Sequence, residues 1–159
     1  MSSSGRARAR APGINLGFDF LPGAVPFEPP APPSTAADVV WLDGWLLNVD
    51  RTARNPNLLS WHREMWLIDF GAALYPQHGT DDLPAEALRP FPALREHVLL
   101  PTAEPLQAAH ARLARPANAA IEQAVAMVPE SWLIAHPREA YAEFLRARLQ
   151  AAPWLEDPK

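Results

Sequence analysis

The stretch "NVDRTARNPNLLSWHREMWLIDFG", residues 48–71, combines a folding signal with a group of polar side chains. Two short apolar runs within it, "NLLSW" and "MWLIDF", are separated by the polar letters "HRE", a pattern that predicts two buried strands joined by a turn. Asp50 and Asn55 precede the first strand, and Asp69 lies at the end of the second. The stretch therefore predicts a β-hairpin with acidic or amide side chains where the chain enters and leaves it.

An apolar helix is predicted directly before the hairpin. Ser34 or Thr35 is expected to cap its first turn, because a hydroxyl oxygen can accept a hydrogen bond from a free helical N–H group. The apolar residues continue until about Asn48. Trp41 and Trp45 lie four residues apart and therefore share one face of the helix, which predicts that both belong to the core.

Four further helical segments are predicted after residue 84. They cover residues 90–100, 103–114, 116–128 and 137–152, and the last has an apolar stripe formed by Tyr141, Phe144, Leu145 and Leu149. Pro137 is expected in the first turn of that last helix, where a missing N–H group is tolerated. Together with the earlier helix and the hairpin, these segments predict a mainly α fold with a short β-hairpin.

The sequence also predicts how the chain is divided. Leu16, Phe18 and Phe20 alternate with smaller or polar residues in a strand-like pattern, just before a run of prolines. The predicted division is a disordered Ser- and Arg-rich tail at 1–13, a Pro-rich connector at 14–33, one folded domain at 34–152 and a second tail at 153–159.

The composition of the 159 residues limits the classes of function. Apolar residues make up 48% of the chain, enough for the core of one domain. The formal net charge of -4 gives no reason to expect a nucleic-acid-binding protein. The absence of cysteine excludes disulfides and thiolate metal sites and suits a cytoplasmic protein. No apolar run approaches the ~20 residues that a membrane span needs, so no membrane partner is expected.

Asp50, Asn55 and Asp69 are the residue types that phosphoryl transfer requires. A carboxylate orients and deprotonates the attacking hydroxyl, and hard oxygen ligands hold Mg²⁺ across the phosphates. In protein kinases an Asn follows the catalytic Asp by five residues, and an Asp-Phe-Gly comes later in the chain. Here Asn55 follows Asp50 by the same interval, and Asp69 begins an Asp-Phe-Gly. Asp-Phe-Gly alone is a weak signal, but the order and spacing of the three groups predict a kinase-type site.

The segment "VVWLDGWLLNVDRTARNPNLLSWHREMWLIDFGAALYPQH" resembles the catalytic half of the HipA-like kinases and is more distantly similar to phosphatidylinositol kinases. The stretches "INLGFDFLPGA", "REHVLLP" and "REAYAEFLRARL" resemble the same family, so the resemblance covers about residues 13–152. It implies a protein-kinase-like fold in which residues 34–152 form the C-lobe. It also implies ATP and Mg²⁺ as cofactors and a protein serine or threonine hydroxyl as the acceptor, with a lipid or a small molecule as the alternative acceptor.

The resemblance implies a role for individual residues. Asp50 would be the catalytic base, and Arg51 would help to hold the loop or a phosphate. Asn55 and Asp69 would be the metal ligands, and Asn57 would support or simply turn the loop. The nucleotide-binding motif would be completed by the two residues after Asp69, which are Phe70 and Gly71.

The chain departs from the family at its amino-terminal side. Kinases cover the phosphates with a glycine-rich loop and contact them with a lysine on a strand. Gly13, Gly17 and Gly23 do not have the spacing of such a loop, and the single lysine is Lys159. The expectation is an isolated second lobe, which is a truncated product, a mis-placed start or half of a split protein. A separately encoded N-lobe is then an expected partner.

Two alternatives remain open at this point. Asp50 and Asn55 are also common turn residues, and Asp69 could simply end a strand. The second alternative is a non-catalytic kinase remnant that acts as a protein-interaction module, through the face where the first lobe would dock. A zinc site is not expected, because the five histidines show no ligand spacing.

Overall fold

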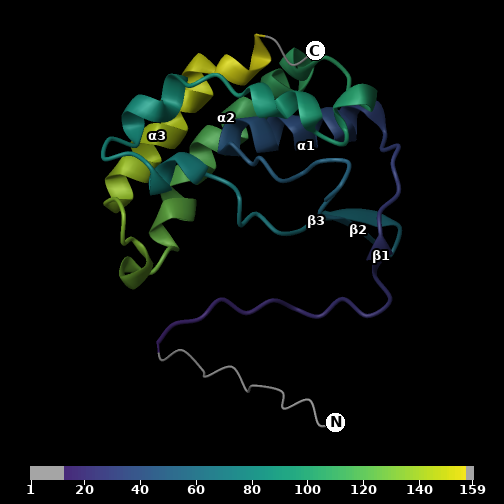
Figure 1. Ribbon diagram of the computed structural model, residues 1–159, viewed down its shortest axis with the longest axis horizontal. Helices are drawn as coiled ribbons and strands as arrows, with labels where there is room; N and C mark the ends of the chain where they lie inside the picture. Colours follow the sequence, from purple (N-terminus) through teal and green to yellow (C-terminus); the bar gives the residue numbers. More distant parts are fainter. Residues whose placement is uncertain (1–12, 157–159) are drawn as a thin grey trace, which may run out of the picture.

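The computed structural model describes residues 13–156 and is mainly helical, with a small antiparallel sheet. The helices gather in one layer, while the sheet and an extended amino-terminal segment lie outside it (Figure 1). The main elements are β1 (Val25–Pro26), α1 (Pro33–Leu46), β2 (Leu58–Trp61), β3 (Glu64–Leu67), α2 (Leu106–Ala126) and α3 (Arg138–Ala151). Short 3₁₀ helices connect them at Tyr75–His78, Pro84–Leu88, Pro92–Glu96, Leu100–Thr102, Glu130–Trp132 and Pro153–Leu155.

Helix α1 is the centre of the core, because it is apolar on almost every face. Trp41 and Trp45 are buried in it, as predicted, and their rings lie 5.6 Å apart. The expected cap at Ser34 or Thr35 is wrong: the helix begins at Pro33, and the N-cap residue Pro32 makes no side-chain hydrogen bond. Proline at the first helical position has a backbone angle already suited to the helix and no N–H group to satisfy.

The predicted hairpin is present as β2 and β3. Glu64 pairs with Trp61, so the turn is shorter than "HRE" and contains only His62 and Arg63. Both turn residues have positive φ, 50° and 68°, as the favoured two-residue hairpin turns require. The sheet also has a third strand that the sequence did not predict: β1 pairs with β2 although it lies in the expected connector. Proline is tolerated there because β1 is an edge strand.

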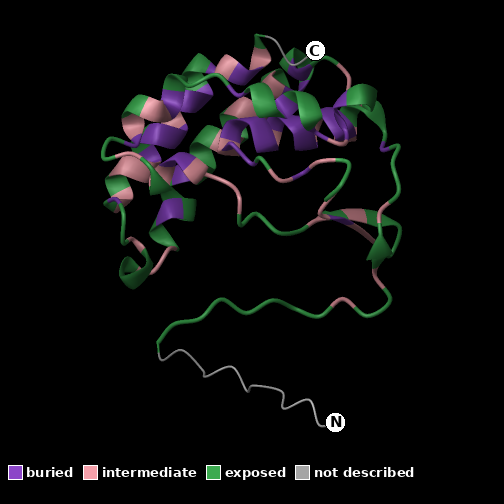
Figure 2. Cartoon of the chain, viewed as in Figure 1, coloured by how far each residue is buried: buried purple, intermediate pink, exposed green. Residues whose placement is uncertain are grey.

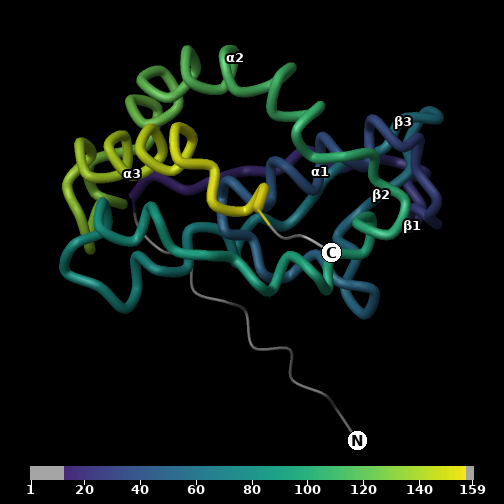
Figure 3. The backbone as a smooth tube through the Cα atoms, turned by 90° about the horizontal axis from the view of Figure 1, so that it is seen from above, coloured from purple at the N-terminus to yellow at the C-terminus, as the bar shows by residue number. Residues whose placement is uncertain are grey.

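The second half of the chain has one long helix where two shorter ones were predicted. Residues 103–114 and 116–128 were expected to form two helices, but α2 is a single helix that continues through Pro116. Figure 3 shows α2 along one side of the helical layer, and it contacts both α1 and α3. Its Ile121 and Val125 are buried, and this packing outweighs the loss of one backbone hydrogen bond at the proline. The segment 90–100 forms short 3₁₀ turns rather than a regular helix.

Helix α3 carries the predicted apolar stripe and an additional buried cation. Phe144, Leu145 and Leu149 are buried, whereas Pro137 is the N-cap residue rather than part of the first turn. Arg148, on the same buried face, is fully buried and donates to backbone carbonyls. Figure 2 shows that the buried residues gather where α1, α2 and α3 meet.

The segments assigned to a connector and a tail differ in how they pack. Leu16, Phe18 and Phe20 form no strand within the described residues and are 66%, 86% and 86% exposed. By contrast, Trp154 is buried against Gly44 of α1, although the sequence placed it in a tail. The predicted disordered tail lies outside the described residues, apart from Gly13. In the described part of the chain, no helix has the length and apolar character needed to span a membrane.

Candidate functional site

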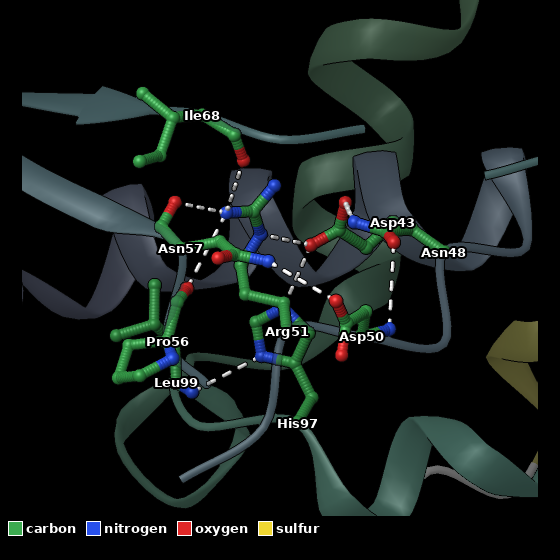
Figure 4. Close-up of polar contacts among 9 residues, drawn as sticks. All are labelled: Asp43, Asn48, Asp50, Arg51, Pro56, Asn57, Ile68, His97 and Leu99. Atoms are coloured by element: carbon green, nitrogen blue, oxygen red, sulfur yellow. Dashed lines mark hydrogen bonds and ion pairs between the residues drawn. The ribbon is translucent and has the colours of Figure 1, made fainter. Parts of the chain in front are cut away.

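The site is built around a buried carboxylate on α1. Asp43 is 0% exposed and accepts three side-chain hydrogen bonds (Figure 4). Asn48 Nδ2 donates to Oδ1 at 2.9 Å, Arg51 Nε donates to Oδ2 at 2.6 Å, and His97 Nε2 lies 3.0 Å from the same Oδ2. An isolated buried carboxylate would be very costly, so these donors are what allow Asp43 to occupy the core.

Arg51 extends from Asp43 to the two ends of the hairpin. Its Nη1 donates to the carbonyl of Asn57, with longer contacts of 3.4 Å to the carbonyls of Pro56 and Ile68. Its guanidinium carbon lies 5.0 Å from the centre of the Phe70 ring, at a distance typical of a cation–π contact. Since Arg51 is 1% exposed, it holds the loop rather than offering its charge to a ligand.

Asp50 lies beside the two asparagines of the same loop. Asn55 Nδ2 donates to Asp50 Oδ2 at 2.8 Å, and Asn57 Nδ2 lies 3.5 Å from the same oxygen. Asp50 is half-buried and Asn55 is exposed. Because the amide nitrogen of Asn55 is used by Asp50, its oxygen is the atom that it can offer to a cation. Asn57 both supports the loop and turns it, with a φ of 50°.

Asp69 is attached to this loop through the backbone. The Ile68 N–H group donates to the carbonyl of Asn57 at 3.0 Å, which places the next residue, Asp69, beside the loop. Asp69 adopts a left-handed backbone conformation with φ of 53°, and its Oδ1 accepts the N–H group of Gly71 at 3.2 Å. Asp69, Phe70 and Gly71 are all exposed. All six predicted site residues therefore lie on two segments that touch each other.

The two residues predicted as metal ligands carry oxygen atoms of the type that hard cations prefer. Asn55 and Asp69 offer one amide oxygen and one carboxylate, and Mg²⁺ is usually held by one or two carboxylates together with water and phosphate. Within residues 13–156, no group of three or more His, Asp or Glu side chains is placed to hold a metal ion. A metal bound by Asn55 and Asp69 would therefore need further ligands, such as water or phosphate oxygens.

A hollow of about 620 Å³ adjoins the Asp69 segment. Trp66, Ile68 and Phe70 line one side, and they are 41%, 36% and 37% exposed. The other side is lined by the extended amino-terminal segment through Leu16 and Phe18. The walls are predominantly apolar, as is usual for pockets that bind small ligands.

Three residues of the site were not predicted from the sequence: Asp43, Asn48 and His97. An acidic residue in the middle of an apolar helix was the available signal for Asp43, since such residues are rarely buried without partners. His97 is 54 positions away from Asp43, and no local pattern links the two.

Comparison with protein-family models, with curated proteins and with solved structures gives no match for this chain.

Proposed function

We propose that this chain is the second lobe of a HipA-like kinase, which transfers a phosphoryl group from ATP to a protein serine or threonine hydroxyl with the help of Mg²⁺. The observation that carries the proposal is the hydrogen bond of 2.8 Å between Asn55 and Asp50, in a loop that is bonded to the Asp69 segment. The sequence resemblance and this arrangement support the same assignment of roles.

Asp50 is the catalytic base in this proposal. Its carboxylate accepts the proton of the attacking hydroxyl, whose oxygen forms the new P–O bond while the bond to the leaving ADP oxygen breaks. The oxygen atoms of Asn55 and Asp69 are the metal ligands. Mg²⁺ bound there would neutralise the charge of the phosphates. Phe70 packs on Arg51, so the Asp-Phe-Gly segment is fixed to the loop that carries the base.

The proposed enzyme is incomplete without an N-lobe. No lysine that could contact the phosphates occurs before Lys159. The apolar hollow beside Asp69 and the exposed side chains of Phe18 and Phe20 support a partner that covers this face. Such a partner would exclude water, which strengthens every electrostatic interaction with the phosphates.

The alternative function is a non-catalytic interaction module. The same exposed apolar residues at 14–20 favour it, because they offer a docking surface whether or not a nucleotide binds. The two proposals differ in one requirement: the kinase lobe needs the carboxylate of Asp69, and the interaction module does not.

Calorimetry with millimolar ATP and Mg²⁺ on the purified chain separates the two functions. The kinase proposal predicts weak binding that requires Mg²⁺ and is lost in Asp69→Asn. The matched control is Asp81→Asn, an exposed loop carboxylate that should leave binding unchanged. If a chain shown to be folded binds no nucleotide, the interaction module is the better description.

A further inference from the structure

We propose that Asp43 is the positioning residue of the site: its carboxylate sets the placement of both the Asp50 loop and the Asp69 segment. The importance of those two segments rests on the proposed function. Asp43 itself is 0% exposed, so it acts through the residues bonded to it and not by touching a metal or a nucleotide.

The two oxygen atoms of Asp43 serve different parts of the loop. Oδ1 accepts the amide of Asn48, whose own oxygen lies 3.4 Å from the backbone N–H group of Asp50. Oδ2 accepts Arg51 Nε. Asn48 before Asp50 and Arg51 after it are therefore both bonded to one carboxylate. This arrangement fixes the backbone that carries the candidate base.

His97 contributes a donor with a defined tautomer. The N–H group of Leu99 donates to His97 Nδ1 at 3.0 Å, so Nδ1 must be the unprotonated nitrogen and Nε2 carries the proton toward Asp43. The backbone of His97 and of the next residue is also attached to the loop: Thr52 forms a β-bridge with His97, and the Val98 N–H group donates to the Arg51 carbonyl at 3.0 Å.

Arg51 transmits the position of Asp43 to the Asp69 segment. One end of its guanidinium contacts Asp43, and the other contacts the carbonyls of Asn57 and Ile68. If the carboxylate of Asp43 is removed, the buried guanidinium of Arg51 loses its anionic partner. Breaking a buried ion pair in this way is strongly destabilising. Arg51 would then shift, and the segments before Asp69 and after Asp50 would shift with it.

Hydrogen exchange measured by NMR on the full chain tests this proposal. In Asp43→Asn, the amides of Ile68 and Val98 are expected to exchange about tenfold faster or more, because hydrogen bonds to a charged group are lost. Amides in α3 should keep their rates. The matched control is Asp38→Asn on the same helix, whose carboxylate pairs with Arg112 at the surface. Unchanged rates at Ile68 and Val98, or an equal increase throughout the chain, would overturn the proposal.

A second pair of variants covers the case in which Asp43→Asn does not fold. His97→Gln keeps an N–H donor that reaches toward Asp43, whereas His97→Phe has none. The proposal expects exchange at Ile68 close to that of the wild type in His97→Gln and accelerated exchange in His97→Phe. Equal behaviour of the two variants would contradict it.

The connection to function is tested with Mn²⁺ and ATP, since Mn²⁺ broadens the NMR signals of nearby residues. In the wild type, the signals of Asn55 and Asp69 should broaden together. In Asp43→Asn, the Mn²⁺ concentration needed for the same broadening should rise about 10–100-fold, as is usual when a residue supporting metal ligands is lost.

No broadening in the wild type would make the proposed function wrong, while the exchange data would still decide the role of Asp43. Equal broadening in wild type and Asp43→Asn would overturn the positioning role alone.

Discussion

Asn55 Nδ2 donates a hydrogen bond to Oδ2 of Asp50 at 2.8 Å, from five residues further along the chain. This bond directs the amide so that its nitrogen faces the carboxylate and its oxygen is left for another partner. One asparagine can therefore hold the candidate base and, in the proposed function, serve as a metal ligand at the same time.

The first prediction concerns Asn55→Leu, which removes both the donor and the oxygen. Because Asn55 is exposed, the free energy of unfolding should change by no more than about 1 kcal/mol. Any Mg²⁺-dependent binding of ATP should be lost. Calorimetry measures the binding and urea unfolding measures the stability. Asn118→Leu, an exposed asparagine on α2, is the control. Undiminished binding by a folded Asn55→Leu variant would remove Asn55 from the site.

The second prediction is that the chain alone transfers no measurable phosphate from ATP. The Asp69 segment borders an open, apolar hollow, so water remains in the site and weakens the electrostatic stabilisation of the transferring group. Incubation with ATP labelled at the γ-phosphate, with and without a candidate protein substrate, measures the transfer. Robust autophosphorylation that disappears in Asp69→Ala would contradict this prediction.

The third prediction concerns the buried Arg148. Its guanidinium donates to the carbonyls of Gly44 and Trp45 in the last turn of α1 and to those of Ala87 and Arg89. Arg148→Met should lower the free energy of unfolding by about 3 kcal/mol or more, because several buried carbonyls lose their donors. Urea unfolding measures this loss, and Arg112→Met at the surface is the control.

The pH dependence of the Arg148 effect follows from its ionisation. Burial lowers the pKa of Arg148 to about 10. This value is below that of the unfolded chain, so stability linked to Arg148 rises with pH only between about 10 and the ordinary arginine value. At pH 6 and pH 8 the side chain is charged in both states. The loss of stability in Arg148→Met should therefore be the same at these two pH values, and a difference between them would argue against a charged Arg148.

The fourth prediction concerns the contact between Gly44 and Trp154. A Cβ atom at Gly44 would lie 2.5 Å from Trp154 Cδ1, too close for either atom to stay in place. Gly44→Ala should therefore destabilise the fold by about 1–3 kcal/mol, as overpacking does. The double variant with Trp154→Leu should lose less stability than the sum of the two single changes. Additive losses in urea unfolding would mean that Trp154 does not pack on Gly44 in solution.

The hairpin and the core helix were predictable because their signals are local. Two apolar runs around a polar turn predicted β2 and β3. The four-residue spacing of Trp41 and Trp45 predicted the buried face of α1. The order of Asp50, Asn55 and Asp69 also lies within one short stretch. That these residues bind a metal ion and a nucleotide stays a prediction.

The features that were not predicted depend on residues far apart in the sequence. The edge strand at Val25 forms only because it meets Ser60, and α2 continues through Pro116 because it packs on two other helices. Asp43 and His97 were missed for the same reason. No local pattern links Asp43 to His97, and the contact between them exists only after the fold has formed.

The contacts of Arg51 also have a consequence for how the protein is made. Its partners extend from Asp43 to Ile68, and the loop that carries it is completed by a bridge to His97. On the ribosome, Asp50 and Asp69 are synthesised well before His97. A nascent chain that stops short of His97 would lack the third donor to Asp43 and the backbone bridge to Thr52. Assembly of the site is thereby delayed until most of the chain has been synthesised, since contacts distant in sequence form only when both partners are present.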